Sequence, residues 1–152
     1  MSRRKTLERL LRIREIQEEQ KKLRLDAAQA TLKSLQRARD AAAEMERGGR
    51  ALAAESVISG ELADRQAGLM QTEFARRRAR MLAPWIASTQ KETVELRRDF
   101  MDKRMQRRQA ETLVGLEDTR DKVESDRRAQ RNVDDWYGAR KHQKGSHDQT
   151  HQ

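Results

Sequence analysis

Apolar residues recur at helical spacing along the first third of the chain. They alternate at intervals of three and four residues, the spacing of side chains that share one face of an α-helix. These positions are Leu25, Ala28, Leu32, Leu35 and Ala42, with Arg39 interrupting the series. The pattern predicts a first helix over about residues 3–54, packed against one partner helix.

Polar residues intrude when this register is followed toward the N-terminus. There it reads Leu7, Leu11, Arg14, Glu18 and Lys21. A second, shifted stripe is formed by Leu10, Ile13 and Ile16. The apolar face is therefore broad and imperfect, which predicts modest packing energy rather than a strict zipper.

Two glycine-containing segments are the best signals for a reversal of the chain. Gly48-Gly49 comes first, and the segment from Ser56 to Gly60 follows it. Because glycine costs about 1 kcal/mol inside a helix, we expect the first helix to fray from Gly48 onward. The turn is predicted at about residues 55–60.

A second helical arm is predicted over about residues 61–141. Its 3-4 series reads Ile86, Thr89, Thr93, Leu96, Phe100, Lys103, Arg107, Ala110 and Val114, and then shifts by one residue to Leu113, Leu116, Arg120 and Val123. Since proline lacks an amide N–H, we expect a kink or break near Pro84. The polar residues 142–152 are predicted to be a disordered tail.

These elements predict an all-α fold in which two long helices form an antiparallel coiled-coil hairpin, a single domain over residues 1–141. Helices of about 50 and about 80 residues span roughly 75 and 120 Å, which is too long for a globule. We expect the chain termini near one end and the turn at the other. The longer second helix should overhang or fold back near Pro84, and pairing between two chains as a dimer is the alternative.

Composition agrees with a thin helical protein. Charged residues make up 39% and apolar residues 35% of the 152 residues, whereas ordinary domains have about 25% and 45–50%. Aromatic residues are only 3%, which argues against a sheet, sandwich or barrel. The chain has no cysteine, so disulfides and thiolate metal sites are excluded.

The net charge of +9 raises nucleic acid as a partner. Basic excess collects in residues 3–14, 76–80 and 97–108, but acidic residues are interleaved almost throughout. Solvated helix faces therefore remain the simpler interpretation, and nucleic-acid binding the alternative. We find no signal-peptide apolar region and no spanning segment of about twenty residues, which predicts a protein that is neither secreted by a classical signal nor membrane-spanning.

Catalytic and cofactor-binding patterns are absent from the sequence. The three histidines, His142, His147 and His151, all fall in the predicted tail. Neither a P-loop nor a dinucleotide-binding glycine motif occurs. We therefore expect no enzyme activity, cofactor, metal site or small-molecule substrate.

Two apolar segments are candidate partner-binding sites. Met81 to Ala87 is the most apolar segment, and it either docks another protein or forms an internal contact where the helix bends. Val133 to Tyr137 carries two acids and a Trp-Tyr pair. Its rings pair with Leu7, Leu10 and Leu11 of the opposite helix, or the motif faces a partner, or both hold, with the apolar edge on the hairpin and the charged edge toward the partner.

The C-terminal segment resembles the end of the FliJ family. It spans Asp126 to Arg140, where Arg and Gln precede an apolar residue, two acids, aromatic residues and a short basic tail. The opening from Leu7 to Glu15 is similar to the start of FliJ and of its virulence-system relatives. The step from Gly60 to Arg65 is similar to the segment before the second FliJ helix, and the resemblance covers nearly the whole chain.

The resemblance implies a cytoplasmic stalk and escort component of the flagellar type III export apparatus, peripheral at the inner membrane. FliJ proteins form a two-helix antiparallel coiled coil similar to the central stalk of rotary ATPases. Their paired ends enter the hexameric export ATPase and promote its assembly and hydrolysis. Their middle segment meets the cytoplasmic linker of the membrane export-gate protein, and some members escort unloaded export chaperones.

Carried over to this chain, the resemblance implies two sets of contact residues. The ATPase-ring contact comprises Leu7, Arg9, Leu11, Arg12, Asp134, Asp135 and Trp136. The export-gate contact comprises Leu69, Thr72, Phe74, Arg76, Ala79 and Leu82. Some family members have an aromatic residue where Thr72 stands and an aliphatic one where Arg76 stands, so the gate contact is expected to centre on Leu69, Phe74 and Leu82.

Three alternatives stay open at this point. The alternatives are a generic structural or adaptor coiled coil, a basic helical nucleic-acid-binding protein, and the virulence-system counterpart of the same family. A monomeric hairpin and a dimer are also not distinguished by the sequence.

Overall fold

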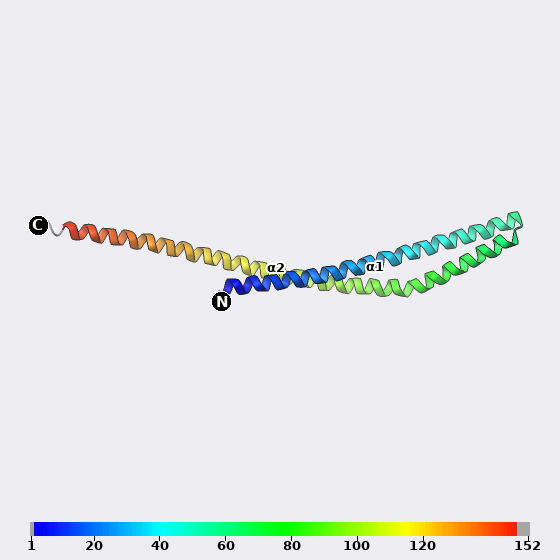
Figure 1. Cartoon of the computed structure of the whole chain (residues 1–152), viewed down its shortest axis with the longest axis horizontal. Coiled ribbons are helices and arrows are strands. Elements are labelled where there is room, and N and C mark those ends of the chain that lie inside the picture. Colours follow the sequence, from blue (N-terminus) through cyan, green and yellow to red (C-terminus); the bar gives the residue numbers. More distant parts are fainter. Residues whose placement is uncertain (1, 149–152) are drawn as a thin grey trace. The chain divides into compact units, whose positions relative to one another are not determined.

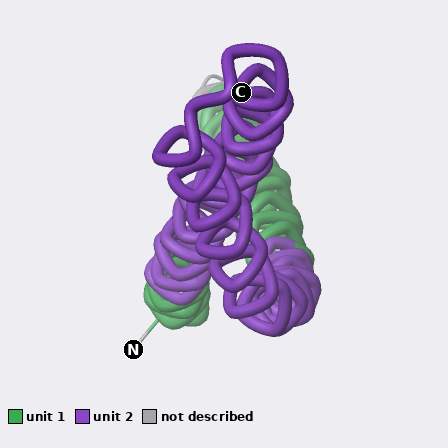
Figure 2. The backbone as a smooth tube through the Cα atoms, turned by 90° about the vertical axis from the view of Figure 1, so that its right-hand side faces the viewer, with its two compact units in different colours: residues 1–15, 105–152 green, residues 16–104 purple. Residues whose placement is uncertain are grey.

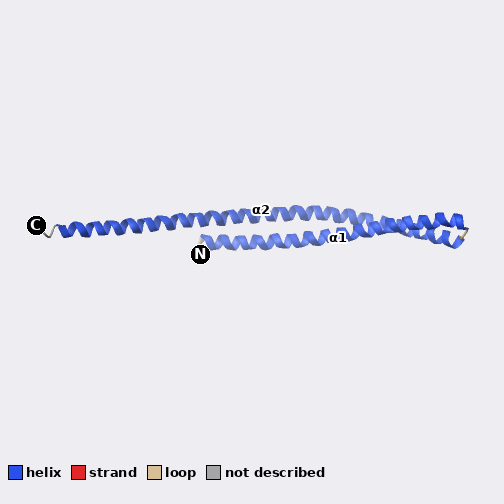
Figure 3. Ribbon diagram, turned by 90° about the horizontal axis from the view of Figure 1, so that it is seen from above, coloured by secondary structure: helices blue, strands red, loops and turns tan. Residues whose placement is uncertain are grey.

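The protein is all-helical, with two helices packed against each other. In the computed structural model, which describes residues 2–148, helix α1 runs from Arg3 to Ser59 and helix α2 from Leu62 to Asp148. No strand occurs among these residues, as Figure 3 shows. The predicted all-α class is therefore confirmed.

The chain groups into two compact units, coloured separately in Figure 2. We call residues 16–104 the turn unit and residues 1–15 with 105–152 the terminal unit. Each unit contains a part of α1 and a part of α2. The sequence had predicted one coiled coil over residues 1–141, and the two units are described separately below.

In the turn unit, α1 reverses into α2 at Gly60 and Glu61 (Figure 1). Gly60 has φ of +74°, and its N–H donates to the carbonyl of Ser56 over 2.9 Å. This arrangement is the left-handed helix cap that glycine favours, because glycine has no Cβ to clash in that conformation. The turn thus begins at the last residue of the predicted range 55–60, where Gly60 takes the required backbone angle.

The pair Gly48-Gly49 does not fray α1, contrary to our prediction. Gly49 is buried, and a Cβ added there would lie 2.5 Å from Thr72 Oγ1 and 2.7 Å from the carbonyl oxygen of Gly68. A Cβ added at Gly68 would lie 2.6 Å from the carbonyl oxygen of Gly49. The two backbones meet here, so both glycines serve close helix packing rather than reversal.

The inward-facing positions of the turn unit form a regular seam. On α1 they include Lys21, Leu25, Ala28, Leu32, Leu35, Ala42, Glu46, Gly49, Ala53 and Ser56, and on α2 Gly68, Thr72, Ala75, Ala79, Leu82, Ile86, Thr89, Thr93, Leu96 and Phe100. The predicted 3-4 series is therefore confirmed by burial on both helices. Ile16 is 51% exposed, so the shifted stripe does not pack there.

Ion pairs between the two helices show the relative direction of α1 and α2 in the turn unit. Lys21 Nζ lies 3.8 Å from Asp99 Oδ2, and Arg76 Nε lies 3.0 Å from Glu46 Oε1. Residue numbers therefore rise along α1 as they fall along α2, the order of antiparallel helices. Near the turn, the amide of Gln71 donates to the carbonyl of Met45 over 2.9 Å.

Helix α2 continues through Pro84, where we had predicted a kink or break. The structure shows one helix across this residue, and a kink there is not shown. Pro84 is exposed while its neighbours Leu82 and Ile86 are buried in the seam. Proline removes one backbone hydrogen bond, to the carbonyl of Arg80. Because the ring lies on the solvent side, the seam keeps its contacts on both sides of it.

In the terminal unit, the start of α1 packs along α2 as far as Glu117. Arg3 Nε lies 3.6 Å from Glu117 Oε2, and Arg4 Nε lies 3.2 Å from Asp118 Oδ1. Arg14 Nη1 donates to Gln106 Oε1 over 2.7 Å. Leu7, Leu11 and Arg14 are half-buried, so the polar register predicted for the start of the chain is confirmed there.

The predicted one-residue shift near Leu113 does not occur. Leu113 and Leu116 are 44% and 63% exposed, while Val114 and Glu117 are the partly covered residues. The seam of α2 therefore keeps its 3-4 spacing to Glu117. Its next positions are Asp121, Glu124, Arg128, Arg131 and Asp135, and these charged side chains give a partner helix no apolar surface to cover.

Residues 119–148 form a segment of α2 that we call the outer arm. Every side chain over residues 119–146 is exposed. The helix continues through residues 142–148, where we had predicted a disordered tail. A helix propagates at little cost once formed, and neither Gly138 nor Gly145 adopts the left-handed angle that ends a helix. The remainder of the predicted tail, residues 149–152, lies outside the described residues.

Candidate partner-binding surfaces

The residues expected to contact an ATPase ring lie in two separate places of the terminal unit. Leu7 and Leu11 are half-buried on α1, and Arg9 and Arg12 are exposed beside them. Asp134 to Trp136 lie on the outer arm. Because Arg3 pairs with Glu117, the acids follow 17 residues later, roughly 25 Å along the helix. The structure does not bring the two halves of the set together.

The aromatic pair on the outer arm is locally ordered. The rings of Trp136 and Tyr137 meet edge to face, with centroids 5.1 Å apart and an interplanar angle of 76°. The guanidinium carbon of Arg140 lies 5.1 Å from the centroid of Trp136, a cation–π distance. The amide of Gln130 donates to Asp134 over 3.0 Å. Trp136 nevertheless remains 56% exposed. An aromatic surface flanked by the acidic side chain of Asp134 and the basic side chain of Arg140 therefore faces outward.

This arrangement decides between the two readings of the C-terminal motif. Its rings do not pair with Leu7, Leu10 or Leu11, because the arm lies beyond the start of α1. They contact each other and Arg140 instead. The motif is thus a surface feature rather than part of the seam.

The residues expected to contact an export gate divide between the seam and the surface of the turn unit. Thr72 and Leu82 are buried against α1, and Ala79 is half-buried. Leu69 and Phe74 are exposed, as is Arg76, which pairs with Glu46. Half of this set therefore faces α1, and only the exposed half is free to meet a partner.

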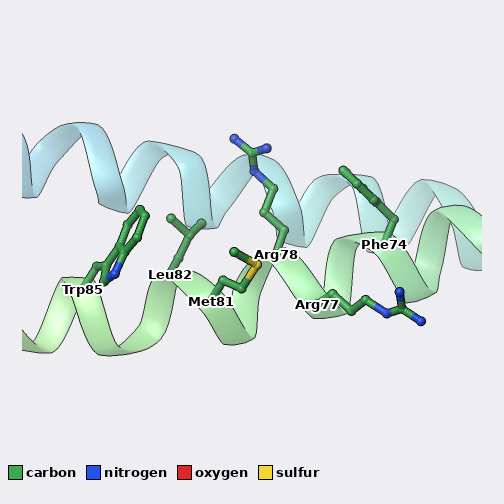
Figure 4. A pocket seen from close by; sticks show the side chains of 6 residues that line it. All are labelled: Phe74, Arg77, Arg78, Met81, Leu82 and Trp85. Atoms are coloured by element: carbon green, nitrogen blue, oxygen red, sulfur yellow. The ribbon is translucent and has the colours of Figure 1, made fainter.

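A groove beside these exposed residues has a volume of about 400 Å³. Figure 4 shows its six lining side chains on α2: Phe74, Arg77, Arg78, Met81, Leu82 and Trp85. A second groove continues from it and is lined by Leu69, Met70, Glu73, Phe74 and Arg77. The Met81 to Ala87 patch thus contributes to an open surface as well as to the seam.

Sequence reasoning missed Met70 as a member of this surface. The signal was present, because Met70, Phe74, Arg77 and Met81 themselves follow a 4-3-4 spacing. A second stripe of this kind is recognisable only when the seam has been assigned to another face.

Positive charge dominates the edge of the grooves. Glu73 accepts from Arg77 and lies 3.5 Å from Arg80. Arg76 donates to Glu46 and thereby holds the pKa of that carboxyl below its ordinary value, with Arg50 adding to the effect. In the terminal unit, the hydrogen bond to Glu8 raises the pKa of Arg4, and the charge of Asp118 raises it further. These pairs are local surface interactions and create no reactive group.

Within the described residues, no group of three or more histidine, aspartate or glutamate side chains could hold a metal ion. His151 lies outside the described part of the chain. No helix among residues 2–148 combines the length and the apolarity needed to cross a bilayer.

Comparisons with protein-family models, with curated proteins and with solved structures returned no match.

Proposed function

We propose that the protein is a non-enzymatic stalk and escort component of a type III protein export apparatus. In this proposal it acts in the cytoplasm, at the inner-membrane export machinery, as an antiparallel coiled-coil hairpin. Its partners are the hexameric export ATPase, the cytoplasmic linker of the export-gate protein and export chaperones. The FliJ-like motif near the C-terminus motivates this proposal.

The observation that carries the proposal is the exposure of that motif on a helix. Asp134, Asp135 and Trp136 lie on the outer arm, where no side chain up to residue 146 is buried. A stalk must present its recognition residues outward on a narrow element that fits a ring cavity. Charged and aromatic groups on such an element steer entry without demanding a large apolar interface.

The position of the motif on the outer arm bears on how the proposed ATPase-ring contact would form. Asp134 lies roughly 25 Å along α2 from the paired residue Glu117, so the motif would enter a ring as a single helix. Arg9 and Arg12 would then meet the ring at a different level from Asp134 and Asp135. The gate contact is correspondingly reduced to Leu69, Phe74 and Arg76, because Thr72 and Leu82 are buried.

The decisive experiment is an ATPase assay with the export ATPase of the same organism, with and without this protein. We expect stimulation of hydrolysis and co-purification of the two proteins. The double variant Asp135→Ala/Trp136→Ala should lose most of the stimulation with unchanged helicity by circular dichroism. The control Lys141→Ala/Lys144→Ala removes two charges from the same arm outside the FliJ-like segment and should stimulate like the wild type.

Absence of both stimulation and co-purification would reject the stalk proposal. Equal stimulation by the two double variants would reject the role of the C-terminal motif. A gel shift with duplex DNA at low and physiological salt tests the nucleic-acid alternative, because binding through phosphates weakens steeply with added salt.

A further inference from the structure

Large apolar side chains remain exposed on α2 in the turn unit, away from the seam. They line the two grooves described above, and each is 55–73% exposed: Leu69, Met70, Phe74, Met81 and Trp85. We call these five residues the apolar stripe. From Leu69 to Trp85 it covers roughly 25 Å of helix. Over residues 86–100, all of which the structure describes, Val94 is the one large apolar residue that is exposed.

The apolar stripe is a continuous surface and not a set of isolated residues. Phe74 lines both grooves, with Met81 and Trp85 in one and Leu69 and Met70 in the other. Figure 4 shows Phe74, Met81 and Trp85 projecting from the same length of α2. Single exposed apolar residues are common on proteins, whereas a contiguous apolar surface marks an interaction site.

The part of the turn unit that carries the stripe is strongly positive. Arg76 lies against Glu46, so the α1 residues alongside residues 69–85 are about 35–51. The two segments together hold eight arginines and four acids. Each acid pairs with an arginine, and the four are Asp40, Glu44, Glu46 and Glu73. Four positive charges are therefore left over.

Part of this positive charge lies within the stripe itself. Arg77 and Arg78 line the groove between Phe74 and Trp85, and its six lining residues include no acid. The next acid of α2 toward the turn, Asp64, precedes the stripe. An occupant of this surface therefore has to offer apolar surface and negative charge along the same line.

The surface of a bilayer that contains anionic phospholipids meets both requirements. Tryptophan and phenylalanine settle at the level of the head groups, and arginines reach phosphates while their stems lie along apolar surface. Phosphates occur everywhere along such a surface, so no matching register of side chains is needed. A protein helix would instead have to place carboxylates beside Arg77 and Arg78 in the middle of its contact, where charge is costly to bury.

We propose that the turn unit binds an anionic bilayer surface directly through the apolar stripe, with α2 lying along the membrane. The apolar side chains enter the boundary between head groups and acyl chains, and Arg77 and Arg78 bond to phosphates. Because the seam lies on another side of α2, binding does not require the two helices to separate.

The proposal goes beyond the stalk function and does not rest on it. Leu69 and Phe74 also belong to the expected export-gate contact, but the partner here is lipid and no other protein takes part. The experiments below contain neither the export ATPase nor the gate protein. They therefore succeed or fail independently of the ATPase assay.

The two tryptophans of the chain report separately on the stripe and on the outer arm. Trp136→Phe leaves Trp85 as the single reporter, and Trp85→Phe leaves Trp136. Each variant is mixed at physiological salt with vesicles of equal parts phosphatidylglycerol and phosphatidylcholine. We expect the emission of Trp85 to move to shorter wavelength and to be shielded from acrylamide, and that of Trp136 to stay unchanged. Vesicles of phosphatidylcholine alone should have little effect, and an unshifted Trp85 with the anionic vesicles overturns the proposal.

A basic chain binds anionic vesicles to some degree through charge alone, so the apolar contribution needs its own test. In vesicle co-sedimentation, Met70→Ser/Met81→Ser should raise the lipid concentration for half-maximal binding about tenfold, because binding scales with the apolar area inserted. Met101→Ser/Met105→Ser makes the same chemical change at exposed positions elsewhere on α2 and should bind like the wild type. Equal binding by both variants, whether weakened or not, overturns the proposal, and circular dichroism checks that each is folded.

Two further outcomes would give the stripe to another occupant. Absence of binding to the anionic vesicles overturns the proposal and leaves a protein partner. If sedimentation velocity then shows self-association that Met70→Ser/Met81→Ser abolishes, that partner is a second copy of this chain.

Discussion

The two units use the same seam with different residues. Near the turn, the inward positions are small, and Gly49 and Gly68 bring the two backbones into contact. In the terminal unit, the inward positions include Arg14 and Glu117, which bond across the interface through long side chains. One spacing thus supports a close backbone contact near the turn and a polar side-chain contact in the terminal unit. The size of the side chain, rather than its periodicity, decides which contact forms.

The largest expected effect is at the close contact. Gly49→Leu places a side chain where even a Cβ meets the backbone of Gly68. Because backbone atoms cannot move aside as a flexible side chain does, we expect a loss of about 3 kcal/mol in stability, the upper range for overpacking. Chemical denaturation followed by circular dichroism measures it. Unchanged stability would show that the helices do not meet at these glycines.

A glycine of the terminal unit provides the opposite case. A Cβ added at Gly115 meets nothing within 4 Å. Gly115→Ala should therefore stabilise the protein by about 1 kcal/mol, since alanine is the better helix former. The same denaturation measurement applies. A loss of stability here would mean that the terminal unit is packed more tightly than the structure shows.

Removing the outermost ion pairs should have a smaller effect. Arg3→Ala/Arg4→Ala eliminates the bonds to Glu117 and Asp118. Exposed pairs contribute about 0–1 kcal/mol each, so the melting temperature should hardly change. Amide hydrogen exchange should become faster at the start of α1 only. Faster exchange throughout the turn unit would contradict this local role.

The smallest expected effect is a dependence of stability on pH. The bond from Arg76 lowers the pKa of Glu46 below its ordinary 4.5. A lowered carboxyl pKa adds stability above the ordinary value, and this stability is lost as pH falls through the lowered one. Glu46→Gln should therefore reduce stability at pH 7 and make little difference at the acidic end of the titration. Melts between pH 2 and pH 7 measure the difference; equal losses at all pH values would assign the effect to packing.

The pKa of Glu61 is shifted in the opposite direction to that of Glu46. Its hydrogen bond with Asp64 raises the pKa of the Glu61 carboxyl. That interaction stabilises the fold at low pH and is lost as pH rises through the raised value. In Glu61→Ala, which has no side-chain donor for Asp64, the stability lost relative to the wild type should therefore be largest at acidic pH, as melts between pH 2 and pH 7 would show.

The sequence predicted the seam well and its exceptions poorly. Leu25, Ala28, Ile86 and Ala110 were assigned to the inward face, and all four are buried. Pro84 and Gly49 were interpreted through their intrinsic preferences, which point to a break and a reversal. Pro84 lies on the solvent side and Gly49 against another backbone, so their surroundings outweighed those preferences. The candidate site residues were only partly predictable, because periodicity does not show that Thr72 faces α1 whereas Phe74 does not.

By itself, the amino-acid sequence determined that this protein is helical, which residues follow the 3-4 repeat, and where that repeat turns from apolar to charged. These properties depend on neighbours within one or two helical turns. Only the tertiary structure decided how closely the helices approach at Gly49 and Gly68, that the side chains of α2 over residues 119–146 stay exposed, and which face keeps Phe74 and Met81 exposed. Those outcomes depend on atoms far apart in the chain, whose contacts local patterns do not encode.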